Sequence, residues 1–309
     1  MTGMHRSGTS WLGAMLSAGG ELLNIQEPLN VNHRQTILRR QAARWYSYIS
    51  ATNEREYLPW YRDALDHRIH PIHDISRARL ISPRDPFRIV QKWASTTRAR
   101  RTRQRVLFKD PFAVFSADWF IAKLRCKTVI SIRHPAAVVS SLKKLGYTFD
   151  FRNLLEQEAL MRDRLDPFRA EMEAACTDPD DVVGQGSLLW RTINGFVAGH
   201  FAQDDDVVLV RHEDLSSDPL RRYEELYDRL GLEFNEAAHR TITRFTSAQN
   251  PSEVSLPQYG NVPLDSRTSI YSWARRLTPG EIERVRRETQ DVWPKFYAEH
   301  DWNVQASPR

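Results

Sequence analysis

The chain has 309 residues, 41% of them hydrophobic, and its 44 Lys and Arg against 39 Asp and Glu give a net charge of +5. This length and apolar content support one large core, so we expect a single domain over residues 1–309 rather than two small ones. The only cysteines, Cys126 and Cys176, exclude a disulfide framework and a cysteine metal site, which favours a reducing, cytoplasmic compartment.

The chain opens on a glycine-rich loop. Residues 3–10, GMHRSGTS, have the spacing of a phosphate-binding loop in which Thr9 replaces the usual lysine. Glycines let consecutive backbone N–H groups converge on phosphate oxygens at a helix start, and Arg6 adds a forked cation. Because the missing lysine is the group that reaches the β- and γ-phosphates of ATP, a P-loop kinase is the weaker alternative.

Only Met1 and Thr2 precede this loop, where a β-strand normally leads into it. We therefore expect the first strand to be absent from this chain, and the sequence leaves open whether a strand, a leader or an anchor precedes Met1. No segment reaches the length of a membrane-spanning helix, and no apolar signal region stands at the front.

Downstream of the loop, residues 11–18 predict a short helix that ends at a glycine pair. Residues 32–70 are rich in arginine and aromatic side chains, and their helical spacing breaks at Pro59. Between about 71 and 105, several prolines predict loops and short elements: Pro71, Pro83 and Pro86.

Three apolar runs predict the strands of a buried parallel sheet: Arg105–Phe108, Thr128–Ile132 and Val207–Val210. A polar turn and a helical pattern follow each run, and two of these helices begin at Pro135 and Pro219. The alternation predicts an α/β fold, P-loop-like and three-layered, with a central, mostly parallel sheet flanked by helices, plus helical insertions.

Two further helices are predicted outside this alternation. The stretch from Leu154 to Cys176 has apolar residues at the spacing of a surface helix. The last helix starts at a capping-box sequence, Thr278 to Glu281, and extends towards Tyr297.

A second candidate anion site lies near the middle of the chain. Arg133 ends the strand 128–132, and Ser141 follows it on the next helix. Parallel α/β sheets bind ligands at the carboxyl ends of their strands, and an arginine beside a helix start suits a dianionic phosphate. Taken alone, each residue is equally an ordinary strand-end arginine or a helix serine bonded to its own backbone.

Both motifs resemble those of the sulfotransferases that use 3′-phosphoadenosine 5′-phosphosulfate (PAPS). The run GMHRSGTSWL resembles their 5′-phosphosulfate loop, and Arg133-His-Pro followed by Ser141 resembles their 3′-phosphate motif. The resemblance implies that the 5′-phosphosulfate is held by Arg6, Ser7, Gly8, Thr9 and Ser10, and the 3′-phosphate by Arg133 and Ser141. Two separate anion sites would then bind opposite ends of one small molecule.

Two further positions carry weaker resemblances. Trp11 stands where cytosolic members of the family stack a tryptophan on adenine, although an ordinary core aromatic explains it equally well. Arg267 lies where members often carry a basic loop over the 3′-phosphate, but a loop arginine is usually only solvated.

Two residues are candidates for the chemistry. Glu27 follows Arg6 at the offset of the catalytic glutamate in tyrosylprotein sulfotransferases, so the resemblance implies that Glu27 is the base. Lys109 opens a K-D-P-F sequence like theirs, which implies that it neutralises charge on the leaving oxygen. We expect Asp110 only to cap the next turn. The histidine base of the cytosolic members is missing unless the fold recruits another histidine, which disfavours the branch that sulfates phenols and steroids.

The resemblance therefore implies an enzyme that moves a sulfuryl group from PAPS to a hydroxyl acceptor without a metal. The aromatic residues between Trp45 and Tyr61 fit a glycan acceptor, although core packing explains them better, and a peptide tyrosine, a lipid or a small metabolite are alternatives. The basic run Arg98–Arg105 is interpreted as a solvated face. Because no base-reading motif accompanies it, we expect no nucleic-acid partner. The sequence does not give the oligomeric state.

Overall fold

The structure, a computed structural model, describes residues 1–33, 37–77, 85–253 and 262–303. Its strands are β1 (Thr2–Gly3), β2 (Leu22–Gln26), β3 (Arg105–Lys109), β4 (Thr128–Ile132) and β5 (Val207–Arg211). The helices of the first half are α1 (Thr9–Leu16), α2 (Glu54–Leu65), α3 (Pro71–Arg77), α4 (Asp85–Arg101), α5 (Ala117–Leu124) and α6 (Pro135–Leu145). The later helices are α7 (Arg152–Leu155), α8 (Glu158–Leu160), α9 (Arg169–Ala175), α10 (Val182–His200), α11 (His212–Ser217), α12 (Pro219–Leu230), α13 (Glu236–Thr246), α14 (Ser266–Ser269), α15 (Trp273–Arg276) and α16 (Pro279–Glu288).

The strand pairings among the described residues are all parallel. In one ladder β4 lies between β1 and β5, and in the other β2 pairs with β3. Met1 joins the two ladders, because its amino group donates to the Phe108 carbonyl oxygen at 2.9 Å and its carbonyl oxygen accepts from the Asp110 N–H at 3.1 Å. The spatial order is therefore β2-β3-β1-β4-β5. The predicted α/β class and the three predicted strands are confirmed.

Thr2 and Gly3 form a short strand where we expected none, and this expectation was wrong. They pair with Ile130 and Ser131 of β4, and the backbone of Gly3 is left-handed, with φ +149°. A Cβ on Gly3 would overlap the Ser131 carbonyl oxygen, so only glycine allows the two strands to approach here.

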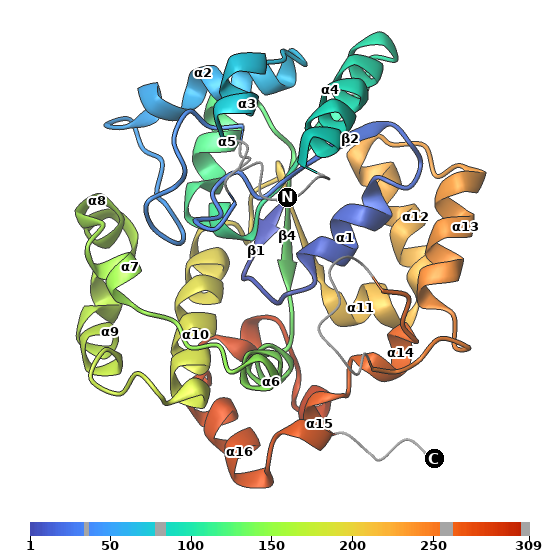
Figure 1. The fold of residues 1–309 in the computed structure, drawn as a ribbon. Coiled ribbons are helices and arrows are strands. Elements are labelled where there is room, and N and C mark those ends of the chain that lie inside the picture. Colours follow the sequence, from blue (N-terminus) through green and yellow to red (C-terminus); the bar gives the residue numbers. More distant parts are fainter. Residues whose placement is uncertain (34–36, 78–84, 254–261, 304–309) are drawn as a thin grey trace.

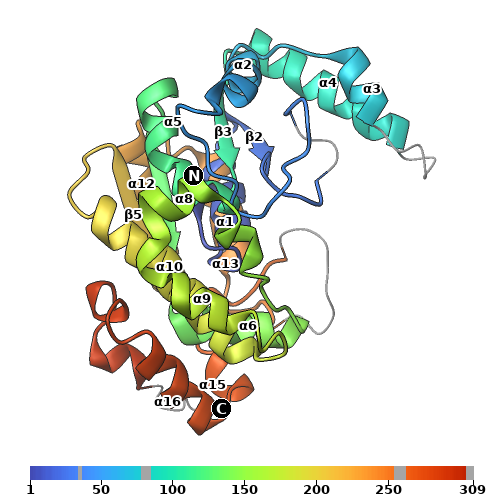
Figure 2. The same ribbon diagram turned by 90° about the vertical axis from the view of Figure 1, so that its left-hand side faces the viewer.

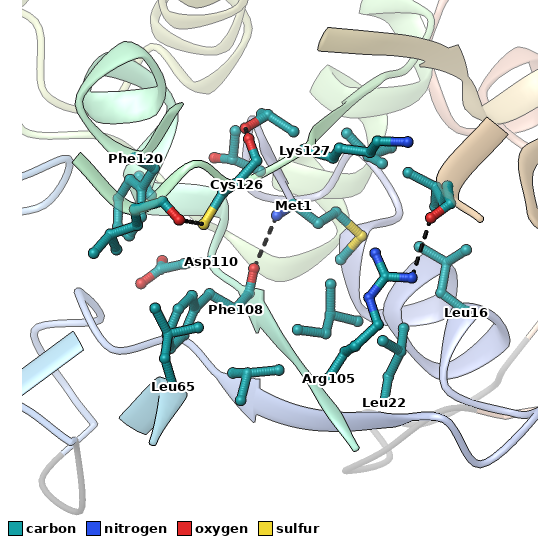
Figure 3. A pocket seen from close by; sticks show the side chains of 18 of the residues that line it. Met1, Leu16, Leu22, Leu65, Arg105, Phe108, Asp110, Phe120, Cys126 and Lys127 are labelled. Carbon is teal, nitrogen blue, oxygen red and sulfur yellow. Dashed lines mark hydrogen bonds between the residues drawn. The ribbon is translucent and has the colours of Figure 1, made fainter. Parts of the chain in front are cut away.

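A cavity of about 500 Å³ opens at the amino ends of the strands (Figure 3). Arg105 and Val106 of β3 and Thr128 and Val129 of β4 line it, together with Met1. Parallel α/β folds bind ligands at the opposite, carboxyl ends of their strands, where both predicted anion motifs begin. None of the predicted anion-binding or catalytic residues lines this cavity, although Asp110, which follows Lys109, does.

Helices cover both faces of the sheet, which confirms the three predicted layers (Figure 1). Because side chains alternate along a strand, β4 contributes to two hydrophobic clusters. Val129 packs with Leu12 of α1 and Tyr223 of α12, whereas Ile130 packs with the cluster formed by α5, α6 and α10. The buried indole of Trp190 on α10 belongs to this second cluster.

The prolines between 71 and 105 start helices and do not interrupt them. Pro71 is the first residue of α3 and Pro86 the second of α4, positions where a missing N–H leaves no hydrogen bond unmade. The helix α2 likewise continues through Pro59. The predicted break at Pro59 was therefore wrong, and so was the prediction of loops and short elements for the 17-residue α4, although α3 is short; Pro83 lies outside the described residues. Figure 2 shows α2, α3 and α4 grouped beside β2 and β3.

The predicted surface helix from Leu154 to Cys176 is wrong in two respects. The stretch is a series of short segments, α7, α8, a π turn at 161–165, a 3₁₀ turn at 166–168 and α9. Leu160, Met161 and Leu165 are fully buried, so the series packs into the core. The capping box at Thr278 is confirmed, although α16 ends at Glu288 and not near Tyr297. No helix in the described part of the chain is both long and apolar enough to cross a bilayer.

Candidate active site

The glycine-rich loop joins β1 to α1 at the carboxyl edge of the sheet. Gly8 stands directly before α1 with φ +90°, a left-handed conformation that favours glycine, and a Cβ there would lie 2.5 Å from His212 Nδ1. No side chain caps α1 within the described residues. The unpaired N–H groups and the positive end of the helix dipole favour an anion at this point.

Arg6 links the loop to α6. Its Nε donates a hydrogen bond to Ser141 Oγ at 2.9 Å, although 135 positions separate the two residues. The backbone at Arg6 is left-handed, with φ +70°, which costs a non-glycine residue about 1–3 kcal/mol. Behind it, the Ser7 carbonyl oxygen accepts a hydrogen bond from Ser131 Oγ at 2.7 Å. The loop is therefore anchored to both β4 and α6.

Arg133 completes this junction. Its Nη1 donates to the Arg6 carbonyl oxygen at 3.1 Å, and its own carbonyl oxygen accepts from Trp190 Nε1 at 2.8 Å. The Arg133 Nε is buried and has no hydrogen-bond partner in the described part of the chain. A buried donor without a partner is costly, so this guanidinium is suited to an anionic ligand. The structure thus brings together the two anion motifs predicted from the sequence.

The charges around this junction repel one another. Burial lowers the pKa of Arg6, and the positive charge of Arg276 lowers it further. Burial also lowers the pKa of Arg133. The negative charge of Glu213 raises this pKa, whereas the positive charges of Arg6 and Arg276 lower it further. Sequence reasoning missed Arg276, because it follows no motif and only its position beside Arg275 marks a basic pair. Arg276 itself pairs with Glu253, at 2.6 Å, so an anion bound here would mainly neutralise the charges of Arg6 and Arg133.

Glu27 and Lys109 lie side by side because β2 and β3 are parallel neighbours with Gln26 opposite Lys109. The Glu27 N–H continues the ladder by donating to the Lys109 carbonyl oxygen at 2.7 Å. The Lys109 side chain is buried, and its Nζ forms an ion pair with Glu27 Oε1 and lies 3.4 Å from Ser10 Oγ. The structure therefore brings both predicted catalytic residues to the edge of the glycine-rich loop.

The carboxylate of Glu27 is held in a fixed position. Asn30 Nδ2 donates to Glu27 Oε2 at 2.6 Å, and the Glu27 backbone is left-handed with φ +50°. Burial raises the pKa of Glu27, but the charge and hydrogen bond of Lys109, the bond from Asn30 and the charge of His33 outweigh it, so the pKa is lowered. Glu27 is thus ionised at neutral pH and able to accept a proton.

Asp110 caps the 3₁₀ turn at 111–116, as predicted, and it also binds the backbone of the segment that follows Glu27. One oxygen accepts from the Phe112 N–H at 3.0 Å and the other from the Leu29 N–H at 2.6 Å. Burial raises the pKa of Asp110 to about 7, against the lowering effect of these two hydrogen bonds. The cap therefore also fixes the segment that follows Glu27.

A model of the sulfotransferase family matches residues 1–236. The chain belongs to the sulfotransferase family. Solved structures similar to this sulfotransferase include a sulfotransferase domain from the curacin biosynthetic pathway, at 13% identity and a TM-score of 0.44, covering 94% of this chain and 98% of that one. Another is mouse sulfotransferase SULT7A1 complexed with PAP, at 16% identity and a TM-score of 0.33, covering 66% of this chain and 71% of that one. A search of curated proteins found no match.

Two predicted residues of the sulfotransferase are not joined to this cluster by any hydrogen bond found in the described residues. The half-buried Trp11 packs edge-on against His212 at 5.2 Å and Tyr223 at 5.5 Å between ring centroids. Arg267 is exposed, and its Nε donates to the Ser217 carbonyl oxygen at 2.9 Å. Stacking of Trp11 on adenine and contact of Arg267 with a phosphate remain predictions.

Two histidines that no motif marks lie close to the sulfotransferase site. His5, within the glycine-rich loop, contacts the Tyr46 hydroxyl through Nδ1 at 2.7 Å. Burial lowers the pKa of His5 to about 4, and the charge of Arg6 lowers it too, so this ring is neutral at pH 7. His33 Nδ1 lies 3.3 Å from the Glu27 carbonyl oxygen. His33 therefore contacts the backbone of Glu27 and His5 contacts Tyr46, and the ionised group beside Lys109 is Glu27.

Proposed function

We propose that this sulfotransferase takes its sulfuryl group from PAPS, transfers it to a hydroxyl acceptor and releases 3′-phosphoadenosine 5′-phosphate (PAP), without a metal. The observation that carries the proposal is the hydrogen-bonded series from Arg133 through Arg6 to Ser141. It supports one binding site with two anion-binding ends, which matches a nucleotide that carries a phosphosulfate at one end and a phosphate at the other.

The residues at the junction fit such a ligand. The uncapped start of α1 and the loop from Arg6 to Ser10 offer N–H groups and hydroxyls to the 5′-phosphosulfate. The unpaired Nε of Arg133 offers a donor to the 3′-phosphate, with Ser141 beside it. No lysine stands in the loop, and among the described residues no group of His, Cys, Asp and Glu side chains could hold a metal ion.

The proposed transfer uses Glu27 and Lys109 together. Glu27 accepts the hydroxyl proton as the acceptor oxygen bonds to sulfur, and the bond between sulfur and the 5′-phosphate oxygen breaks. Lys109 stabilises the negative charge that develops on that leaving oxygen. In the structure Lys109 pairs with Glu27 and keeps the pKa of Glu27 low. During transfer, attraction of Lys109 to the leaving oxygen would weaken this ion pair, which would raise the pKa of Glu27 and make it a stronger base.

Transfer of labelled sulfate tests the proposal. The purified protein is mixed with ³⁵S-labelled PAPS, a panel of alcohols, phenols and sugars, and EDTA. The proposal expects labelled sulfate ester and PAP to form in equal amounts without metal. Transfer that requires added Mg²⁺, or consumption of ATP in place of PAPS, would show that the site belongs to another reaction.

The proposal also concerns the type of hydroxyl acceptor and the cellular compartment. Of the aromatic residues between Trp45 and Tyr61 that fit a glycan acceptor, the core buries Tyr46, Tyr48 and Tyr61, which are therefore not exposed to stack on a sugar. A glycan acceptor stays a prediction. The free thiols of Cys126 and Cys176 support the expected reducing compartment.

The basic run Arg98–Arg105 gives no specific support to a nucleic-acid partner. Most of its arginines are exposed at the end of α4, while Arg105 Nη1 donates to the carbonyl oxygens of Leu230 and Gly231, at 3.2 and 3.0 Å. Arg105 thus has a structural role at the end of α12, and we keep the interpretation of a solvated face for the others.

A further inference from the structure

A cavity of about 270 Å³ lies between the edge strand β2 and the group of helices α2, α3 and α4, which Figure 2 shows beside it. Residues Leu23 to Gln26 of β2 form one wall, and Glu27 is the next residue in the chain. His33 also lines it, and its Nδ1 lies 3.3 Å from the Glu27 carbonyl oxygen. The cavity is therefore adjacent to the proposed base.

One wall residue, Asn24, also approaches the lysine, at Gly13 of α1, which does not itself line the cavity. Asn24 lines the cavity, and a Cβ placed on Gly13 would lie 3.4 Å from Asn24 Nδ2 and 3.0 Å from Lys109 Cγ. The Asn24 amide and the Lys109 stem therefore approach the same point. Asn24 Oδ1 is buried and has no hydrogen-bond partner among the residues described. This oxygen is free to accept a hydrogen bond from a bound hydroxyl group.

Several polar side chains in the walls are bonded to the protein. Asp74 accepts from Lys92 Nζ at 2.6 Å and from Trp93 Nε1 at 2.8 Å. The imidazole of His73 bonds the Leu38 carbonyl oxygen at 2.9 Å. Outside the cavity, Asp63 lies 3.1 Å from Arg68 and 3.0 Å from His70 and so pairs with both.

The rest of the wall includes an apolar surface. It consists of two indole rings and aliphatic side chains: Trp60, Trp93, Leu23, Ile25, Ile37, Ala64 and Ile69. A sugar needs a hydrogen-bond partner for each hydroxyl that it buries, and burying one without a partner costs about 1–3 kcal/mol. An apolar body has no such requirement and gains free energy by leaving water.

We propose that this cavity binds the acceptor, and that the acceptor is an alcohol whose hydroxyl is attached to an apolar body of one or two rings. The inference rests on the proposed function, because sulfuryl transfer is what requires a hydroxyl beside Glu27. The size follows from the volume: a cavity of roughly 150 Å³ holds benzene, so about 270 Å³ accommodates one ring with a short chain or two fused rings.

Filling the cavity tests the inference. Thr96 and Thr97 are both half-buried threonines on α4, but Thr96 lines the cavity and Thr97 does not. Each is replaced by tryptophan, and sulfate transfer from labelled PAPS is measured with 2-naphthaleneethanol and with methyl β-glucoside. We expect transfer to the naphthalene alcohol and not to the glucoside. We also expect Thr96→Trp to raise its KM at least tenfold and Thr97→Trp to change it less than twofold.

The melting shift caused by PAP separates this inference from the proposed function. No shift in the unsubstituted protein contradicts the proposed function itself. A normal shift with equal KM values in both variants, or with transfer to the glucoside alone, overturns only the acceptor site. If Thr96→Trp loses the PAP shift and so is misfolded, Ser95→Phe takes its place. Ser95 is an exposed residue of the same wall, and the same tenfold rise in KM is expected.

Discussion

Arg133 donates a hydrogen bond from Nη1 to the backbone oxygen of Arg6, 127 positions earlier in the chain, at 3.1 Å. Arg6 in turn donates from Nε to Ser141, on the helix that follows Arg133. Residues from the front and the middle of the chain thus form one positively charged site. Burial lowers the pKa of both arginines, and nearby positive charge lowers it further, so a doubly anionic ligand would offset an electrostatically unfavourable arrangement.

Replacing Arg133 should distinguish the contribution of the 3′-phosphate end of this site from that of the 5′ end. We expect Arg133→Ala to weaken PAP binding about 10- to 100-fold, because a hydrogen bond to a charged group contributes about 1.5–3 kcal/mol. Adenosine 5′-phosphosulfate, which has no 3′-phosphate, should lose less than threefold. The measurement is calorimetric titration of both ligands, with Arg55→Ala, at an exposed position of α2, as the comparison. An equal loss for both ligands would remove Arg133 from the 3′ end.

The base is tested by Glu27→Gln. We expect this variant to bind PAP as the unsubstituted protein does and to lose at least 100-fold in kcat, because an amide cannot accept the hydroxyl proton. Steady-state transfer of labelled sulfate measures the effect. Glu56→Gln is the control, since Glu56 is an exposed glutamate in the first turn of α2. Transfer at the normal rate by Glu27→Gln would show that another group is the base.

Gly8 and Gly20 allow the loop geometry to be tested with a matched pair. Both have a positive φ, +90° and +83°, but a Cβ on Gly8 would meet His212 whereas nothing lies within 4 Å of a Cβ on Gly20. We expect Gly20→Ala to cost about 1 kcal/mol of unfolding free energy and Gly8→Ala at least about 2 kcal/mol. Urea unfolding measures both values. Only Gly8→Ala should also lose the PAP melting shift; equal effects at the two sites would contradict the proposed packing of the loop.

Much of the sheet followed from pattern alone. The strands β3, β4 and β5 are rich in apolar, mostly β-branched residues, and the helices α6 and α12 start at prolines and end before glycines, so local signals were sufficient. The strand β2 was missed because it is only half-buried and its packing comes from other elements, among them the distant α4. The loops predicted at Pro71 and Pro86 were wrong because a proline in the first turn of a helix favours that helix.

The sequence predicted those residues of the candidate site that belong to recognisable motifs. The glycine-rich loop, Arg133 and Ser141 have fixed spacings, and Glu27 and Lys109 follow from a resemblance. Arg276 carries no such pattern and was found only because its charge acts on Arg6 and Arg133. The cavity beside β2 combines residues from four elements and has no sequence signature at all.

Acidification should destabilise the protein partly through His5. The pKa of His5 is about 4 in the folded protein and about 6.5 when unfolded, so between these values the unfolded chain binds more protons and stability falls as the pH falls. We expect the loss of unfolding free energy from pH 7 to pH 5 to be about 2 kcal/mol larger for the unsubstituted protein than for His5→Gln. Urea unfolding at both pH values measures this difference. Parallel pH profiles for the two proteins would show that His5 does not contribute.

The most direct test of the two-ended site is the stoichiometry and selectivity of nucleotide binding, measured by calorimetric titration in EDTA. The predicted result is one molecule of PAP bound per chain, with adenosine 5′-phosphate and adenosine 3′-phosphate each binding at least tenfold more weakly, because each lacks one of the two anionic groups. Two molecules of PAP per chain, or PAP bound no more tightly than adenosine 5′-phosphate, would contradict the account.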